Sequence, residues 1–210
     1  MTPPPILPAG GGPIASQSEK TGGGVKVALC HDWLNGMRGG EKCLDVLCEL
    51  YPEAEIYTLF HERGKVSKII ESHPIRCSWL GHLPRVFRFY RYYLPLFSSA
   101  IESFRLKDLD LVISTSHCVA KGIRKNKNAI HICYCFTPVR YAWELFEEYF
   151  QSKSWFSKKA IRFFTERLRR WDLRSNTGVD YFVAISEHVK KRIWNYYKRE
   201  AEVIYPPVDT

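Results

Sequence analysis

The chain has 210 residues, of which 45% are apolar and 14% aromatic, and its formal net charge is +9 at pH 7. At about 150 residues per domain this length allows one domain, and so large an apolar fraction excludes a wholly disordered chain. No uninterrupted run of about 18 apolar residues occurs, which argues against a transmembrane span. The positive charge favours an acidic partner, namely phosphate, anionic lipid or nucleic acid.

Residues 1–24 differ in composition from the rest of the chain. They include five prolines and six glycines, and no basic stretch precedes an apolar one, so the segment is not a secretory signal. Such a composition cannot bury enough surface to offset its ordering entropy. We expect a disordered tail without a function of its own, followed by one folded domain at 25–210.

The domain alternates strand patterns with helix patterns. In chain order we expect strands at 25–30, 54–60, 74–79, 109–114, 129–135, 180–185 and 202–205. We expect helices at 39–51, 65–72, 85–105 (broken or kinked at Pro95), 139–150, 155–174 and 187–199, the last with Ser186 as N-cap. The helix at 155–174 carries a stripe of Ile161, Phe164, Leu168 and Trp171. Strands that are apolar on both faces, separated by helices, predict an α/β fold. We expect a single Rossmann-like three-layer domain with a mostly parallel sheet.

The loop after the first strand is the most informative, because ligands of such sheets bind beyond the carboxyl ends of the strands. Gly39 and Gly40 open a helix, so backbone N–H groups and the helix dipole are available to a diphosphate. A tight strand–helix turn without a ligand explains the same residues. The patterns GxGxxG and GxxxxGK[ST] are absent, which argues against an NAD enzyme and a P-loop kinase.

Two more strands deliver polar residues to the same edge. Thr115, Ser116 and His117 follow the strand at 109–114, and His117 is either a structural hydrogen-bonding group or a catalytic one. The segment 136–144 follows the strand at 129–135 and combines a hydroxyl, a guanidinium, a carboxylate and aromatic rings. This mixture suits a sugar, and an ordinary helix turn with a buried Trp143 is the alternative.

The seven cysteines include no CxxC pair, and several lie in apolar segments. We interpret them as buried free thiols in a reducing compartment. Cys133 and Cys135 share one face of a strand, but no further ligands lie near them in the sequence, so we expect no metal site.

Four segments together resemble retaining family 4 glycosyltransferases of GT-B fold. They are 31–42 (HDWLNGMRGGEK), 113–122 (ISTSHCVAKG), 133–143 (CYCFTPVRYAW) and 203–210 (VIYPPVDT). The resemblance covers about residues 25–210 and is greatest to bacterial mannosyltransferases of O-antigen and exopolysaccharide assembly.

The resemblance implies the N-terminal, acceptor-side half of a GT-B fold, with the second, donor-binding domain absent and with little or no activity of this chain alone. It implies transfer of a sugar, with mannose from GDP-mannose expected, to a lipid-linked saccharide with retention of configuration. No metal or cofactor is expected besides the nucleotide-sugar, which is a co-substrate. A separate chain could supply the donor domain.

The resemblance also assigns roles on the donor side. Gly39 and Gly40 would lie against the donor diphosphate. His117, the expected catalytic residue, would lie beside the transferred sugar. The departing phosphate would take the proton of the acceptor on the same face.

On the acceptor side, the resemblance implies contacts from Glu41, Thr137, Arg140 and Tyr141. Phe136 stands where close relatives usually have histidine, and its ring can stack but cannot hydrogen-bond. This difference bears on which acceptor is used.

Two basic, aromatic segments favour contact with an anionic membrane surface. The resemblance implies a cytoplasmic location, at the inner face of the plasma membrane, because the family acts on lipid-linked acceptors there. Residues 84–97 place Arg85, Arg88 and Arg91 among six aromatic residues, and 153–174 carries eight basic side chains. Core helices with solvated basic edges explain these segments equally simply.

Two other classes of function compete with a transferase. A nucleic-acid binder is disfavoured because no RNP, KH, zinc-finger or helix-turn-helix signature occurs. A non-catalytic domain that binds a sugar or nucleotide, or one subunit of a split enzyme, is the main alternative.

Overall fold

The structure, a computed structural model, describes residues 24–139 and 155–208. The tail expected at 1–24 lies outside the described residues except for Gly24, and so does the helix expected at 139–150 except for Val139.

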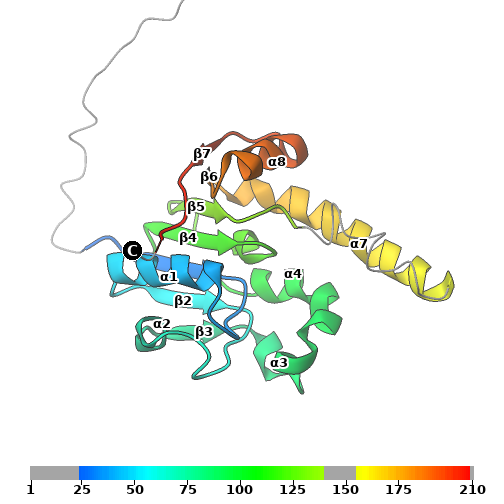
Figure 1. Cartoon of the computed structure of the whole chain (residues 1–210), viewed down its shortest axis with the longest axis horizontal. Helices are drawn as coiled ribbons and strands as arrows, with labels where there is room; N and C mark the ends of the chain where they lie inside the picture. The colour runs from blue at the N-terminus through cyan, green and yellow to red at the C-terminus, as the bar shows by residue number, and fades with distance from the viewer. Residues whose placement is uncertain (1–23, 140–154, 209–210) are drawn as a thin grey trace, which may run out of the picture.

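A sheet of seven parallel strands forms the middle of the domain (Figure 1), in the order β3-β2-β1-β4-β5-β6-β7. The strands are β1 (Val27–His31), β2 (Glu55–Thr58), β3 (Ile75–Cys77), β4 (Leu111–Ser116), β5 (Ile130–Cys135), β6 (Tyr181–Ala184) and β7 (Ala201–Val203). The expected α/β fold with a parallel sheet is confirmed. The strand order reverses between β1 and β4, where such folds bind ligands.

Helices α1 (Gly39–Leu50) and α2 (Lys68–Ser72) cover one face of the sheet. Leu44 of α1 and Ile70 of α2 belong to the same buried cluster as Leu29, Ile56 and Ile113 of the strands. Because neighbouring positions of a strand point to opposite faces, Ala28 and Val112 point the other way.

Helices α4 (Leu94–Glu102), α7 (Trp155–Ser175) and α8 (Glu187–Tyr197) cover the opposite face. Ile101 of α4 and Trp171 of α7 share a buried cluster with Ala28 and Val112. Ile193 of α8 packs in a further cluster with the β6 side chains. The hydroxyl of Ser186 accepts a hydrogen bond from Val189 N at 3.3 Å, so the predicted N-cap of α8 is confirmed.

The helix expected at 85–105, broken or kinked at Pro95, is interrupted earlier than expected. The segment instead forms α3 (Val86–Phe89), a 3₁₀ turn η2 (Tyr90–Tyr93) and then α4, whose first turn contains Pro95. Proline lacks an N–H, and its ring clashes with the preceding turn of a helix, so it is tolerated only where a helix begins. The break therefore precedes Pro95.

The apolar stripe predicted on α7 is only half buried. Leu168 and Trp171 are buried, whereas Phe164 is 44% exposed, and the side chain of Ile161 lies outside the described part. The N-terminal half of α7 extends beyond the sheet (Figure 1). Among the described helices, none is both long enough and apolar enough to span a bilayer.

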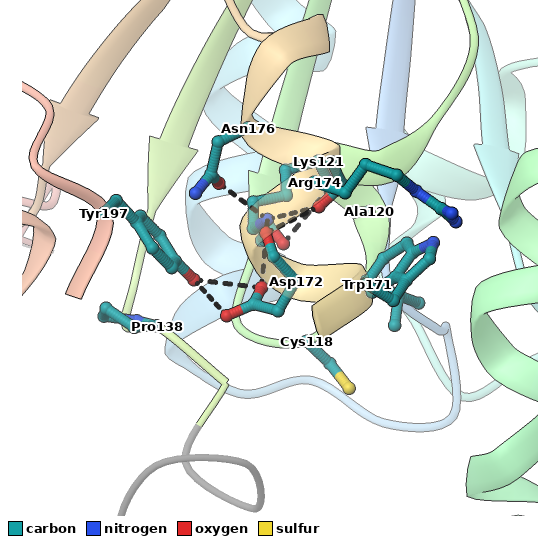
Figure 2. A network of polar contacts seen from close by, with 12 residues as sticks. Cys118, Ala120, Lys121, Pro138, Trp171, Asp172, Arg174, Asn176 and Tyr197 are labelled. Carbon is teal, nitrogen blue, oxygen red and sulfur yellow. Dashed lines mark hydrogen bonds and ion pairs between the residues drawn. The ribbon is translucent and has the colours of Figure 1, made fainter. Parts of the chain in front are cut away.

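A buried ionic network joins the 3₁₀ turn η3 (Ala120–Gly122) to α7 and α8 (Figure 2). Lys121 Nζ lies 2.9 Å from Asp172 Oδ1 and donates to Asn176 Oδ1 at 2.9 Å. The Tyr197 hydroxyl donates to both carboxylate oxygens of Asp172, at 3.0 and 2.9 Å. The network connects the loop after β4 with the two helices that flank β6.

All seven cysteines have free thiols. Six are buried as predicted, but Cys77 is exposed because it ends β3, the edge strand of the sheet.

Candidate functional site

A pocket of about 800 Å³ lies at the carboxyl edge of the sheet. The residues that line it come from the ends of β1, β4, β5 and β6, from the first two turns of α1 and α8, from the 3₁₀ turn η2 and from the segment after β7. It therefore occupies the position beside β1 and β4 that the strand order predicts for a ligand.

Five residues that the sequence predicted as site residues line this one pocket: Gly39, Gly40, Glu41, His117 and Thr137. Their predicted convergence is confirmed, although their roles stay predictions. The two others, Arg140 and Tyr141, lie outside the described residues.

The two glycines at the start of α1 have different surroundings. A Cβ added at Gly39 would meet no atom within 4 Å, so the space beside it is open. A Cβ at Gly40 would lie 3.1 Å from Phe136 Cε2 and 3.4 Å from His31 Cε1. The Phe136 ring therefore packs over Gly40, and a ligand could approach the backbone more closely at Gly39.

Glu41 is buried in the first turn of α1, where its carboxylate accepts a hydrogen bond from Arg38 N at 3.1 Å. Its Oε1 lies 3.9 Å from His31 Nε2. Burial raises the pKa of this carboxyl, but the interactions with His31 and with backbone N–H groups outweigh burial and lower it. Glu41 thus caps its own helix and also presents a negative charge at the pocket wall.

His31 ends β1 and is fully buried. Its Nδ1 lies 2.7 Å from Thr115 Oγ1, and the Thr115 hydroxyl donates to Cys30 O at 3.3 Å. The hydroxyl hydrogen is therefore used, and Thr115 accepts the bond from His31 Nδ1–H. This arrangement directs Nε2 of His31 toward Glu41.

Asp32 follows β1 and is fully buried, yet it is an ionised carboxylate. It accepts hydrogen bonds from four consecutive backbone N–H groups after β4, and Oδ2 lies 3.0 Å from His117 Nδ1. Burial alone raises the pKa of Asp32, but His117 and these hydrogen bonds hold it well below its ordinary value. Asp32 thereby fastens the loop after β4 to the end of β1.

The ring of His117 packs against Trp33 edge to face, with centroids 4.5 Å apart. Trp33 in turn stacks on Phe60 with centroids 6.2 Å apart. The His117 side chain is 33% exposed and belongs to the pocket lining. His117 is thus held on one side by a carboxylate and on another by an aromatic ring, and its side chain forms part of the pocket lining.

Several lining residues were not predicted from the sequence. They include Trp33, Arg38, Arg91, His188, Arg192 and Pro206. The end of β6 at Ala184 was the available signal for the α8 residues, because residues that follow a parallel strand reach the same edge. Asp32 was also missed, although an ionisable residue directly after an apolar strand marks a position near the ligand edge.

Positive charge predominates in the pocket. The described lining contains three arginines and three histidines, and Glu41 is its only acidic residue. The N-termini of α1 and α8 add the positive ends of their helix dipoles. Such a surface attracts anions and suits a phosphate-bearing ligand. Within the described residues, no group of three or more His, Cys, Asp or Glu side chains could hold a metal ion.

The sequence matches no protein-family model and no curated protein sequence. Sixteen chains of known structure are similar in fold, and they include three crystal structures of HepE from Anabaena. The complex of HepE with UDP has a TM-score of 0.51 and 13% identity, over 88% of this chain and 45% of HepE.

The complex of HepE with UDP-glucose has a TM-score of 0.48 and 15% identity over 87% of this chain and 44% of HepE. The complex with UDP and glucose has a TM-score of 0.49 and 14% identity over 87% of this chain and 45% of HepE. The chain thus spans less than half the length of HepE and has the fold of a Rossmann-like half of a GT-B protein.

Proposed function

We propose that this chain is the acceptor-side domain of a glycosyltransferase. The observation that carries the proposal is the convergence of Gly39, His117 and Thr137 on one cationic pocket at the reversal point of the strand order. HepE, whose fold is similar over most of this chain, has been crystallised with UDP. A pocket of this charge in this fold supports a nucleotide-sugar as the ligand.

On the donor side, the diphosphate lies at the N-terminus of α1, where the space beside Gly39 is open. The transferred sugar lies beside His117. In the transfer, the bond between C1 of the sugar and the diphosphate oxygen breaks, and C1 bonds to the acceptor oxygen on the same face. The departing phosphate takes the proton of the acceptor hydroxyl, so configuration is retained. The domain contributes positioning and electrostatic stabilisation, and the proposal includes no metal or cofactor.

The acceptor lies on the side of Glu41, Thr137, Arg140 and Tyr141, and we propose a lipid-linked saccharide. An exposed surface formed by Arg85, Phe87, Arg88, Phe89 and Tyr92 supports a lipid-linked substrate. This aromatic–arginine surface continues into the pocket through Tyr90 and Arg91. Rings and arginines together suit the interface of an anionic membrane, so we place the chain at the inner face of the plasma membrane.

The sugar and the nucleotide are tested together. We propose GDP-mannose as the donor and use UDP-glucose as the competing probe. A titration of the isotope-labelled chain with each, followed by amide NMR, detects binding even in the millimolar range. We expect shifts at Gly39, Gly40 and His117, larger with GDP-mannose. Shifts centred away from the carboxyl edge, or none with either compound, would contradict the proposal.

The variant Gly39→Ala provides a steric test of the diphosphate site. The added methyl meets no protein atom within 4 Å, so stability should not fall. It would enter the space assigned to the diphosphate, and affinity for the nucleotide-sugar should fall about tenfold, or about 1.4 kcal/mol. Gly178→Ala is the matched control, since it also adds a methyl to open space but lies outside the pocket.

Transfer itself is measured with a radiolabelled nucleotide-sugar and lipid-linked acceptors. Sugar incorporated into the lipid fraction supports the transferase. If the chain binds the nucleotide-sugar but incorporates no sugar into any acceptor, the alternative is favoured, namely a non-catalytic nucleotide-sugar-binding domain.

A further inference from the structure

We infer that a groove beside α8 is a second binding site, which takes a neutral saccharide with the indole of Trp194 as its stacking platform. The groove has a volume of about 620 Å³ and is lined by the outer face of α8, by residues 199–200 and by the start of β7. It shares no lining residue with the pocket at the carboxyl edge of the sheet. The site is therefore independent of nucleotide-sugar binding, and only its link to an acceptor chain rests on the proposed function.

The groove lies on the face of α8 that the core does not use. Val189, Ile193 and Tyr197 recur every four residues and are buried in the cluster around β6. Because a helical turn takes 3.6 residues, the groove residues 187, 190, 191, 194 and 195 share the opposite side of the helix. The tryptophan among them thus has no packing role in the core.

Trp194 lies in the last turn of α8 and is 53% exposed. Within the part of the chain that the structure describes, its ring makes no aromatic or cation–π contact and its indole N–H makes no hydrogen bond. Tryptophan combines a large apolar face with a polar N–H group, so an indole that is left open suits a ligand with both apolar and polar parts. The C–H face of a sugar ring packs on such a surface.

The polar side chains around Trp194 are available for hydrogen bonds to a ligand. Three glutamates, two lysines and one asparagine line the groove: Glu187, Glu200, Glu202, Lys190, Lys191 and Asn195. None of these six side chains forms a hydrogen bond or an ion pair with the described residues. Carboxylates accept, ammonium groups donate and an amide does both, so this set matches sugar hydroxyls, each of which donates and accepts.

Arg199 gives the groove a fixed wall. Its guanidinium donates to Asn176 O at 3.0 Å. Two further bonds lead to the carbonyl oxygens of Val179 and Asp180, both at 2.9 Å. The guanidinium also packs over the Phe182 ring, with Cζ 5.2 Å from the ring centroid. This wall is in place before a ligand binds, which limits the entropy lost on binding.

The charge balance of the groove favours a neutral ligand. Its lining contains three acidic and three basic residues, whereas positive charge predominates in the pocket at the carboxyl edge. Three carboxylates repel the phosphates of a nucleic acid or of an anionic membrane. The centre of a protein interface is apolar and poor in charged residues, and here charged residues surround a single indole. A neutral saccharide fits both the ring and the polar groups.

Binding is measured by ¹H–¹⁵N NMR of the labelled full chain, with the indole N–H signal of Trp194 as the readout. The variant Trp194→Phe assigns this signal by its absence. The ligands are mannotetraose and cellotetraose, which are neutral, and tetragalacturonate, which is an anionic saccharide of the same length. We expect at least one neutral saccharide to shift the Trp194 signal at millimolar concentration, and tetragalacturonate to shift it less. No shift with either neutral saccharide, or a larger shift with tetragalacturonate, would overturn the inference.

Three variants test the stacking platform. Trp194→Ala changes an exposed position, so the melting temperature should change little. Its affinity for the neutral saccharide, followed on the amide signals of Asn195 and Ala201, should fall about tenfold. Trp194→Phe keeps an aromatic face and should retain more affinity than Trp194→Ala.

Trp79→Ala is the matched control, because Trp79 is 41% exposed and lies outside the groove. It should bind the saccharide as the wild type does. Wild-type affinity in Trp194→Ala, or an equal loss in Trp79→Ala, would contradict the role of the Trp194 ring.

Nucleotide-sugar binding separates this inference from the proposed function. Trp194→Ala should leave the shift of the Gly39 amide by GDP-mannose unchanged, because the two sites share no lining residue. If saccharides shift the Trp194 signal but no nucleotide-sugar binds, the proposed function fails and the groove stands. If GDP-mannose shifts the Gly39 signal and no saccharide shifts that of Trp194, the inference alone fails. A Trp194 signal that changes with protein concentration alone would assign the groove to contact between copies of this chain, and the inference would fail as well.

Discussion

Gly122 lies so close to the indole of Trp171 that the backbone has no room for a side chain there. A Cβ at this position would lie 2.3 Å from Trp171 Cζ2 and 2.7 Å from Cη2. Gly122 belongs to η3 and Trp171 to α7, so the close approach lies where these two elements pack together.

We therefore expect Gly122→Ala to lower the free energy of unfolding by about 2 kcal/mol, as overpacking typically does. Urea denaturation followed by circular dichroism provides the measurement. Gly178→Ala, which meets no atom within 4 Å, is the control and should change stability by a few tenths of a kcal/mol at most. Equal denaturation midpoints for the two variants would show that α7 shifts to accommodate the added methyl group without loss of stability.

His131 gives the protein a specific pH dependence of stability. It is buried on β5, where Nε2 lies 2.8 Å from Ser114 Oγ and Nδ1 lies 3.1 Å from Gly178 O. Burial, together with the nearby lysine charges, lowers its pKa from 6.5 to about 4 despite the bond to the Gly178 carbonyl. The unfolded chain therefore binds a proton more readily than the folded one.

The stability that neutral His131 contributes is fully present above pH 6.5 and is lost as the pH falls through 6.5 toward 4. At 1.36 kcal/mol per pKa unit, the loss amounts to about 3 kcal/mol. The lowered pKa of Asp32 acts at more acidic pH, outside this window. Urea denaturation midpoints at several pH values measure how steeply stability changes with pH. His131→Gln should flatten it, and an unchanged slope in that variant would assign the effect to other groups.

At the level of secondary-structure elements, the ion pair between Lys121 and Asp172 connects the loop after β4 to α7 and α8. Lys121 is only 2% exposed and Asp172 is fully buried. Removal of one partner of such a pair leaves a buried charge without compensation, which costs about 3–5 kcal/mol.

We expect Lys121→Met to lose stability in this range. The double variant Lys121→Met with Asp172→Asn should recover part of it, because the amide oxygen still accepts from the Tyr197 hydroxyl without a buried charge. Tyr197→Phe removes one neutral donor and should cost only about 1–2 kcal/mol. A double-mutant cycle from urea denaturation tests this, and additive losses would show that the two charges do not interact.

The elements themselves were predictable to different degrees. Strands and the helices α1 and α8 agree with their sequence patterns, because apolar periodicity and caps such as Ser186 are local signals. The segment 85–105 was harder to predict. Its apolar and aromatic residues suit a helix, but Pro95 and the packing of Phe97 and Ile101 divide it. The exposure of Phe164 was also not predictable, because periodicity does not show where the sheet beneath a helix ends.

At the scale of the whole molecule, the positive charge and the exposed aromatic rings predict that the chain binds anionic membranes. The net charge is +9, and Tyr92 is 82% exposed beside Arg88 and Arg91. A basic residue near an anionic surface contributes about 1 kcal/mol. We therefore expect binding to vesicles that contain phosphatidylglycerol, little binding to phosphatidylcholine vesicles, and a decrease when salt rises.

The variant Arg85→Gln with Arg88→Gln should weaken sedimentation with anionic vesicles at least tenfold. Lys127→Gln with Lys191→Gln makes the same change in charge at two exposed positions elsewhere and is the control. If both double variants lose binding equally, the net charge and not the aromatic–arginine surface is responsible. Binding that is insensitive to salt and lipid charge would contradict the membrane proposal.

The sequence by itself determined that apolar strands alternate with helices, and hence that a parallel sheet brings Gly39, Gly40, His117 and Thr137 to one edge. These are consequences of periodicity and of strand ends, which a short stretch of chain contains in full. Only the tertiary structure decided what surrounds each of them. Asp32 meets the N–H groups of 117–120 across 85 to 88 residues of sequence, and Phe136 covers Gly40 from another strand. Such contacts depend on which strands are neighbours, and no local pattern encodes that choice.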